Sequence, residues 1–139
     1  LETEIIPEIE KKIEKNNKKV KYYAIAGYSL SGLFGLYSGY KTNKFKKIII
    51  ASGSMWYPNL GNYIKENKIS SKVESIYFSL GNKEKISKNP ILKSVEEKTK
   101  LIQEYLSNKV KTIYEENEGN HFNETAKRIA KGIKWSLEN

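Results

Sequence analysis

The chain has 139 residues, 38% of them hydrophobic, which suffices for one domain with a single buried core. It has no cysteine, which excludes disulfides, a cysteine nucleophile and zinc–thiolate sites. With one histidine (His121) and no aspartate, a metal ion would have to be held by glutamate oxygens and at most one imidazole. We therefore expect neither a metal nor a cofactor.

The formal net charge is +9, and nearly all basic side chains are lysines, because Arg128 is the only arginine. Base readout and bidentate phosphate binding favour arginine, and the lysines are scattered through the chain. We interpret the charge as a solvated, lysine-rich surface and expect no nucleic-acid partner. There is no apolar run of membrane-spanning length and no signal-peptide pattern. We therefore expect no membrane partner and a cytoplasmic protein.

The chain alternates between helical and strand-like patterns. Residues 1–15 have apolar residues at helical spacing, and Pro7 marks a start or a bend of that helix. Strand-length segments rich in β-branched and aromatic residues are Lys21–Ala26, Lys46–Ser52, Val73–Leu80 and Val110–Tyr114. Helices are predicted over Ser31–Tyr40, within the irregular stretch 56–71, from Asn89-Pro90 to Leu106, and after His121.

This alternation predicts a three-layer α/β/α domain over residues 1–139, with a mostly parallel sheet and helices on both faces. The apolar residues of the last two helices are predicted to face the sheet. They are Ile91, Leu92, Val95, Ile102 and Leu106 in one helix, and Phe122, Ala126, Ile129, Ala130, Ile133 and Leu137 at the C-terminus.

A candidate nucleophile lies at the junction of the first strand and the next helix. The segment Gly27-Tyr28-Ser29-Leu30-Ser31-Gly32 has the form G-x-S-x-S-G, typical of a nucleophile elbow, whose small residues let strand and helix pack closely. Such a turn would lift the Ser29 hydroxyl above the carboxyl edge of the sheet. It would also direct the Leu30 backbone N–H toward a developing oxyanion.

A serine hydroxyl needs a base within hydrogen-bond reach, and His121 is the only imidazole in the chain. His121 follows the last predicted strand, so it should lie at the same edge of a parallel sheet as the elbow. A surface histidine in a turn would look the same in isolation. Taken together with the elbow, the pattern favours Ser29 as nucleophile and His121 as general base.

A third group should orient the imidazole, and without aspartate a carboxylate must come from glutamate. Glu84 is our choice, because it follows the third predicted strand. The rivals are Glu115, Glu116 and Glu118, which are closer to His121 in sequence; Asn82 as a neutral substitute; and a Ser–His dyad with no third member. We assign Tyr28, Ser54 and Trp56 to a substrate pocket, with core packing as the alternative for Trp56.

These motifs, in this order, resemble the Putative esterase family of α/β-hydrolases, which includes esterase D, and within it the enterochelin (siderophore) esterase-like branch. The resemblance rests on Ile6–Ile9, Ala26–Phe34, Ser52–Trp56, Leu80–Glu84 and Gly119–His121. It implies a serine esterase that cleaves a small-molecule carboxylester through an acyl-serine intermediate, and the branch suggests a siderophore-like ester.

Two features depart from the family pattern. Ser31 stands where glycine is usual, and serine is small enough for the turn. The family's early strands, which carry the loop donating a second oxyanion N–H, have no counterpart, so the resemblance implies the C-terminal part of a hydrolase. A sheet edge bared in this way favours a homo-oligomer. The alternative function is an inactive α/β fragment or a binding module with a basic surface.

Overall fold

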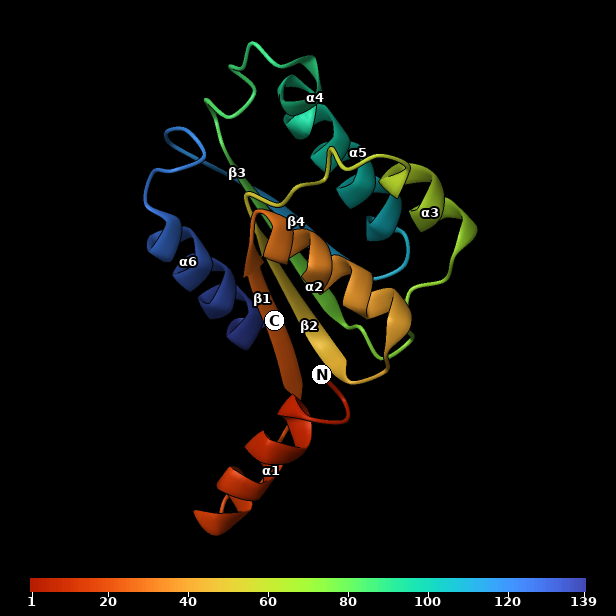
Figure 1. The fold of residues 1–139 in the computed structure, drawn as a ribbon, viewed down its shortest axis with the longest axis vertical. Helices are drawn as coiled ribbons and strands as arrows, with labels where there is room; N and C mark the ends of the chain where they lie inside the picture. The colour runs from red at the N-terminus through yellow and green to blue at the C-terminus, as the bar shows by residue number, and fades with distance from the viewer.

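A computed structural model describes the whole chain, residues 1–139, and Figure 1 shows its fold. The helices are α1 (Ile5–Lys15), α2 (Leu30–Lys41), α3 (Leu60–Glu66), α4 (Pro90–Lys93), α5 (Val95–Ser107) and α6 (Thr125–Glu138). The strands are β1 (Tyr23–Tyr28), β2 (Phe45–Ala51), β3 (Ser75–Gly81) and β4 (Lys111–Asn117). All the predicted strands are present, with ends that differ by a few residues.

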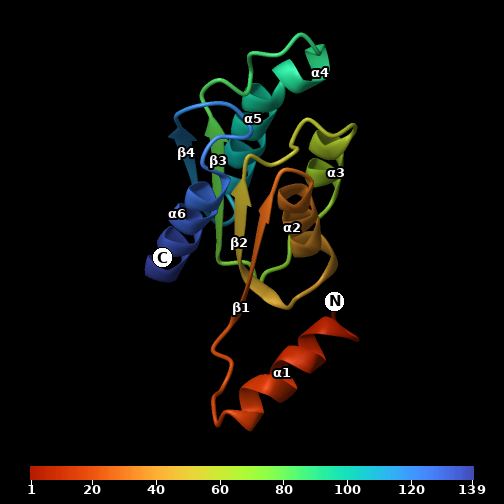
Figure 2. The same ribbon diagram turned by 60° about the vertical axis from the view of Figure 1, so that its left-hand side comes forward.

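The four strands form one sheet in the order β1-β2-β3-β4, and every neighbouring pair is parallel. Figure 2 shows α6 on one face of the sheet and α2, α3 and α5 on the other. The structure therefore confirms the three-layer α/β class. Because the strands are parallel, the loops that follow β1, β2, β3 and β4 all emerge at the same edge.

The main core lies between the sheet and the α2, α3 and α5 layer. Alternate strand residues point to opposite faces, so Ile48 and Ile50 of β2 face this core together with Ile76 and Phe78 of β3. Helix residues complete the cluster, among them Leu36, Ile64, Ile102 and Leu106. Burial of this continuous apolar layer positions α2, which follows the elbow.

The expectation that the apolar side of the C-terminal helix faces the sheet is wrong. Phe122 and Leu137 are 84% and 69% exposed, whereas α6 buries Arg128, Gly132 and Ser136 against the sheet. The reason is close packing: a Cβ on Gly132 would lie 2.4 Å from the Cγ2 atom of Ile49. The absence of a side chain at Gly132 lets the helix backbone approach β2 and β3 this closely.

The predicted helix after Asn89 is divided at Ser94 into α4 and α5. The Asn89 side chain accepts a hydrogen bond of 2.9 Å from the Ile91 N–H, as expected of an N-cap before a proline. Ile91 and Leu92 of the short α4 are 51% and 38% exposed, in contrast to the prediction. The predicted inward residues of α5, which are Val95, Ile102 and Leu106, are buried, and Thr99 is buried beside them.

Helix α1 begins at Ile5, close to Pro7 as expected, and lies apart from the sheet in both views (Figures 1 and 2). Ile6 is its only buried residue. The Tyr23 hydroxyl at the start of β1 donates a hydrogen bond to Glu10, which links the helix to the sheet. None of the helices has the length and apolar character needed to cross a bilayer.

Two helical glycines offer a matched test of the α6 packing. In Gly132→Ala, the new methyl group would collide with Ile49 and with the Tyr77 ring, 2.7 Å from its Cδ1 atom. We expect the free energy of unfolding, measured with urea, to fall by about 1–3 kcal/mol. In Gly61→Ala, the methyl group meets nothing within 4 Å, so stability should be unchanged or rise by up to about 1 kcal/mol. Equal effects of the two substitutions would contradict the packing argument.

Candidate active site

Ser29 joins β1 directly to α2 in a backbone conformation that serine rarely adopts. Its φ is 55° and its ψ is −119°, a region that costs about 1–3 kcal/mol for a residue with a side chain. The surrounding backbone holds it there: the Ser29 N–H donates to the Ala51 carbonyl at 3.1 Å, and the Ser54 N–H donates to the Ser29 carbonyl at 3.0 Å. The turn is thus strained and fixed to the neighbouring strand.

Small residues permit this turn. A Cβ on Gly27 would lie 2.2 Å from the Ser31 carbonyl oxygen, so no larger residue fits there. Ser31, where the family pattern has glycine, closes the turn with its side chain. Its hydroxyl donates to the Tyr28 carbonyl at 2.7 Å and accepts from the Tyr28 N–H at 2.8 Å. Leu30 is the first residue of α2, where backbone N–H groups have no acceptor within the helix.

The loop after β3 brings Glu84 to His121 of the loop after β4. The Nδ1 atom of His121 lies 2.8 Å from the Oε2 atom of Glu84. The Glu84 side chain is only 4% exposed, and that of His121 is 33% exposed. Because a carboxylate can only accept, Nδ1 is the protonated nitrogen of the neutral ring, and Nε2 carries the free lone pair.

The rival orienting groups are engaged elsewhere. Glu115 pairs with Lys131 at 2.6 Å and accepts from the Tyr77 hydroxyl at 2.7 Å. The Asn82 side chain accepts from the Gly119 N–H at 3.0 Å. Neither Glu116 nor Glu118 forms a side-chain hydrogen bond with His121. Of the groups considered from the sequence, Glu84 is the one in contact with the imidazole.

Ser29 and His121 line the same cleft, which has a volume of about 450 Å³. Its wall also contains Trp56, Lys83 and Glu84. The Ser29 hydroxyl has no hydrogen-bond partner within the protein. In unliganded enzymes the bond between nucleophile and base is often long and tightens only with substrate bound.

Two residues that we assigned to a substrate pocket lie outside this cleft. The Tyr28 hydroxyl donates to the His121 carbonyl at 2.6 Å, and the two rings lie with their centroids 5.4 Å apart. Ser54 is 3% exposed, and its backbone supports Ser29 as described above. Both residues therefore support the loops that carry Ser29 and His121. Trp56 lines the cleft.

Sequence reasoning missed Arg128 and Ser52, which both contact Glu84. The Oε1 atom of Glu84 accepts from Arg128 at 2.8 Å, from the Ser52 hydroxyl at 2.7 Å and from the Gly81 N–H at 2.6 Å. The interpretation of the basic residues as a solvated surface does not hold for Arg128, which is 1% exposed. One signal was available: the only arginine of a lysine-rich chain follows the candidate base closely, in the first turn of the next helix.

The environment of Glu84 keeps it ionised. Burial raises the pKa of the Glu84 carboxyl, but hydrogen bonds from His121, the Gly81 N–H and the Ser52 hydroxyl outweigh that effect. The pKa of Glu84 therefore lies below its usual value of 4.5. No group of three or more His, Cys, Asp or Glu side chains is gathered as in a metal site.

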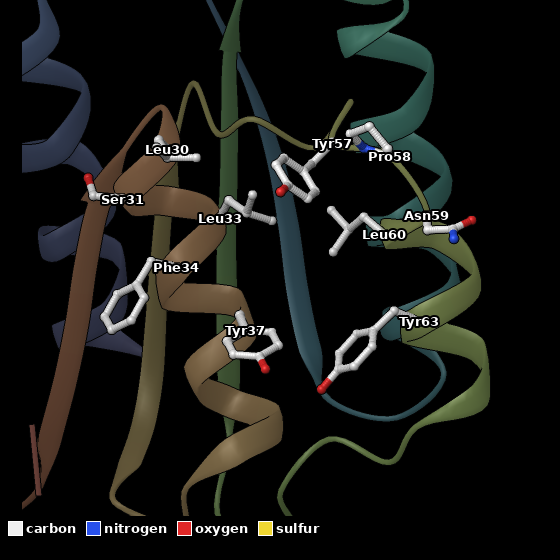
Figure 3. A pocket seen from close by; sticks show the side chains of 10 residues that line it. All are labelled: Leu30, Ser31, Leu33, Phe34, Tyr37, Tyr57, Pro58, Asn59, Leu60 and Tyr63. Carbon is white, nitrogen blue, oxygen red and sulfur yellow. The ribbon is translucent and has the colours of Figure 1, made fainter.

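An apolar hollow of about 680 Å³ lies next to the cleft, between α2 and the segment 57–63. Figure 3 shows Leu33 and Tyr37 of α2 facing Tyr57, Leu60 and Tyr63 across it. Leu30, the neighbour of Ser29, also lines this hollow. Trp56 lines the cleft and Tyr57 the hollow, so consecutive residues connect the two spaces.

A parallel α/β sheet with a strained serine at a strand–helix turn, and an acid–histidine pair at the same edge, defines an α/β-hydrolase. The model of the Putative esterase family matches residues 1–126, and the chain belongs to that family. A comparison with curated proteins finds no match.

Solved structures of an enterobactin esterase from Shigella flexneri share this fold. The chain is 17% identical to the structure in the presence of 2,3-dihydroxy-N-benzoyl-glycine, with a TM-score of 0.67, covering 99% of this chain and 36% of that one. For the structure in the presence of 2,3-dihydroxy-N-benzoyl-serine, the identity is 19% and the TM-score 0.68, and the match covers 98% of this chain and 35% of that one. For a further structure of enterochelin esterase from Shigella flexneri, the identity is 18% and the TM-score 0.70, and the match covers 98% of this chain and 34% of that one. The chain thus spans about a third of the length of these proteins.

The lowered pKa of Glu84 predicts a pH-dependent contribution to stability. Because the folded-state pKa lies below the unfolded one, this contribution is complete above about pH 4.5 and is lost as the pH falls through the folded-state value. In Glu84→Gln, the free energy of unfolding should therefore fall less steeply over this acid range than in the wild type. Urea unfolding at a series of pH values measures the slope.

Glu104→Gln is the control, because Glu104 is exposed and its carboxylate forms no hydrogen bond. Its slope should parallel that of the wild type. If the free energy of unfolding of Glu84→Gln changed with pH as steeply as that of the wild type and of Glu104→Gln, Glu84 would not be preferentially ionised in the folded chain.

Proposed function

We propose that this chain carries the catalytic centre of a serine carboxylesterase, with Ser29 as nucleophile, His121 as general base and Glu84 as the group that orients the imidazole. The observation that carries the proposal is the 2.8 Å contact between His121 Nδ1 and Glu84 Oε2, in the cleft that Ser29 also lines. With Nδ1 engaged, Nε2 is the nitrogen left to take the hydroxyl proton. Membership of an esterase family supports the same reaction class.

In this mechanism the Ser29 oxygen attacks the ester carbonyl while His121 Nε2 takes the hydroxyl proton. The resulting imidazolium is stabilised by the ionised Glu84. The Leu30 N–H, at the positive end of α2, donates to the oxyanion of the tetrahedral intermediate. His121 then returns the proton to the leaving alcohol, which leaves an acyl group on Ser29. A water molecule, deprotonated by His121, hydrolyses this acyl-serine and restores the hydroxyl.

The substrate class we propose is a small-molecule carboxylester with a large apolar or aromatic portion. The support is the apolar hollow that begins at Leu30, one residue from the nucleophile. The benzoyl compounds named with the enterobactin esterase structures make a siderophore-like aromatic ester the specific form of this proposal. We propose that residues 1–139 act as one domain in this reaction, without a metal or cofactor.

A fluorophosphonate probe tests the nucleophile. We expect mass spectrometry of the labelled chain to place the phosphonyl group on Ser29, and Ser29→Ala to abolish labelling. In His121→Ala, labelling should slow by about a hundredfold or more, because the general base is lost. Ser87→Ala is the matched control, since Ser87 lines the same cleft away from the elbow, and it should label like the wild type. No labelling of the folded wild-type chain would instead favour an inactive α/β module.

The hollow predicts a substrate preference that one truncation should alter. Phe34 lines the hollow with 48% of its surface exposed. For Phe34→Ala we expect kcat/KM for a benzoyl ester to fall by about tenfold, through the loss of apolar contact, relative to the acetyl ester of the same alcohol. Leu101→Ala, at an exposed position of α5, should leave this ratio unchanged. An unaltered ratio in Phe34→Ala would exclude the hollow as part of the substrate site.

A further inference from the structure

The only arginine of the chain lies at the centre of the loops that carry the proposed catalytic residues. Arg128, in the first turn of α6, is 1% exposed, so its charge is removed from water. A buried charge is costly unless it is paired and its donors are satisfied. Its position in the fold therefore calls for an explanation beyond surface charge.

One side of the guanidinium neutralises the inner oxygen of Glu84. Nη1 of Arg128 donates to Glu84 Oε1 at 2.8 Å and to the Ser52 hydroxyl at 2.9 Å, and it lies 3.2 Å from the Tyr28 hydroxyl. Ser52 in turn donates to the same Oε1 atom. Oε1 is thus fully engaged by buried donors, which leaves Oε2 of Glu84 to face His121.

The other side of the guanidinium holds the backbone of the loop that carries His121. Nη2 donates to the carbonyl oxygens of Glu118 at 3.0 Å and Asn120 at 2.9 Å. The space for it depends on Gly81, where a Cβ would lie 2.6 Å from Nη2. One side chain therefore connects the orienting carboxylate with two backbone carbonyls of the loop that carries the imidazole.

We propose that Arg128 is a positioning residue for the His121–Glu84 pair: it fixes the carboxylate and the His121 loop in one arrangement through a single buried guanidinium. The inference rests on the proposed esterase function. A lysine could not replace it, because an ammonium group lacks the planar fork that reaches the carboxylate on one side and two carbonyls on the other.

Arg128 should also weaken the electrostatic effect of Glu84 on the His121 imidazole. Its positive charge offsets that of Glu84, so the imidazolium gains less from the carboxylate than it would from an uncompensated one. The other titratable groups around this pair are Lys83 on the cleft wall, the Tyr28 hydroxyl from β1, and Tyr114 of β4, whose pKa is raised mainly by burial and further by Glu96, Glu116 and Glu84. A substitution of Arg128 alone leaves the chemical identity of all these groups unchanged.

The chain is well suited to an NMR test, because its single imidazole and single guanidinium give unambiguous signals. In the wild-type protein we expect the Arg128 guanidinium resonances to shift with the same midpoint as the His121 ring when the pH is varied. Guanidinium resonances that do not respond to protonation of His121 would overturn the proposal. This measurement needs no variant and no substrate.

In Arg128→Gln we expect the pKa of His121 to rise by about one unit, because the charge opposing Glu84 is lost. Arg128→Lys keeps that charge but loses the fork. It should therefore leave the pKa close to that of the wild type while slowing fluorophosphonate labelling of Ser29 by about tenfold or more. Lys131→Gln is the matched control, since it removes one positive charge from an exposed position of α6; it should change neither property.

The outcomes separate the two proposals. Absence of labelling in the wild type contradicts the esterase function, whatever Arg128 does. If the wild type labels at Ser29, and the folded Arg128 variants label at the same rate with an unchanged or lowered His121 pKa, the positioning role is overturned. If neither Arg128 variant folds, the wild-type titration of the guanidinium signals still decides.

Discussion

The buried ion pair between Arg128 and Glu84 constrains the rest of this structure. Its side chains are 1% and 4% exposed, with 2.8 Å between Nη1 and Oε1. Two charges so far from water are tolerated only where neighbouring groups satisfy most of their remaining hydrogen-bonding capacity. Here the Tyr28 hydroxyl at the end of β1, the Gly81 N–H at the end of β3 and groups of the loops after β2 and β4 do so, and only Nε of the guanidinium has no partner. The pair therefore joins four segments that are distant in the sequence. The candidate active site lies on the solvent-exposed side of this ion pair, where His121 contacts Glu84.

The same ion pair explains the unusual packing of α6. Its first turn carries the guanidinium inward, so the helix presents Arg128, Gly132 and Ser136 to the sheet and leaves its larger apolar residues outside. Gly132 permits close approach to β2 and β3, which brings the arginine within reach of Glu84. An apolar inward face would hold the helix farther from the sheet. Here the geometry of the site determines which face of the helix is buried.

Strain and support are combined along the carboxyl edge of the sheet. Ser29 and Ser52, after β1 and β2, both have positive φ values, 55° and 48°. Each is tied by its backbone N–H to the next strand, Ser29 to Ala51 and Ser52 to Ser79. These bonds connect each turn to the neighbouring strand and supply the local rigidity that a strained turn needs. The elbow therefore depends on the adjacent strands as much as on its own small residues.

The sequence by itself determined the parallel α/β class, the strand–helix turn at Ser29, and the gathering of the loops that follow the strands at one edge. These features follow from hydrophobic periodicity and small-residue spacing, which are local properties of the chain, and from the geometry of parallel strands. It also favoured Glu84 as the group that orients the imidazole, but it left Glu115, Glu116, Glu118 and Asn82 as alternatives.

Only the tertiary structure decided which carboxylate contacts His121 and which face of α6 is buried. It also showed that Tyr28 and Ser54 hydrogen-bond to the backbone of His121 and Ser29 and do not line the cleft. It also revealed the role of Arg128 in the fold, which no local pattern predicts. These outcomes depend on contacts between residues far apart in the chain. There, the pairing of the buried Arg128 with Glu84 and the close approach at Gly132 outweigh the hydrophobic pattern of a single helix.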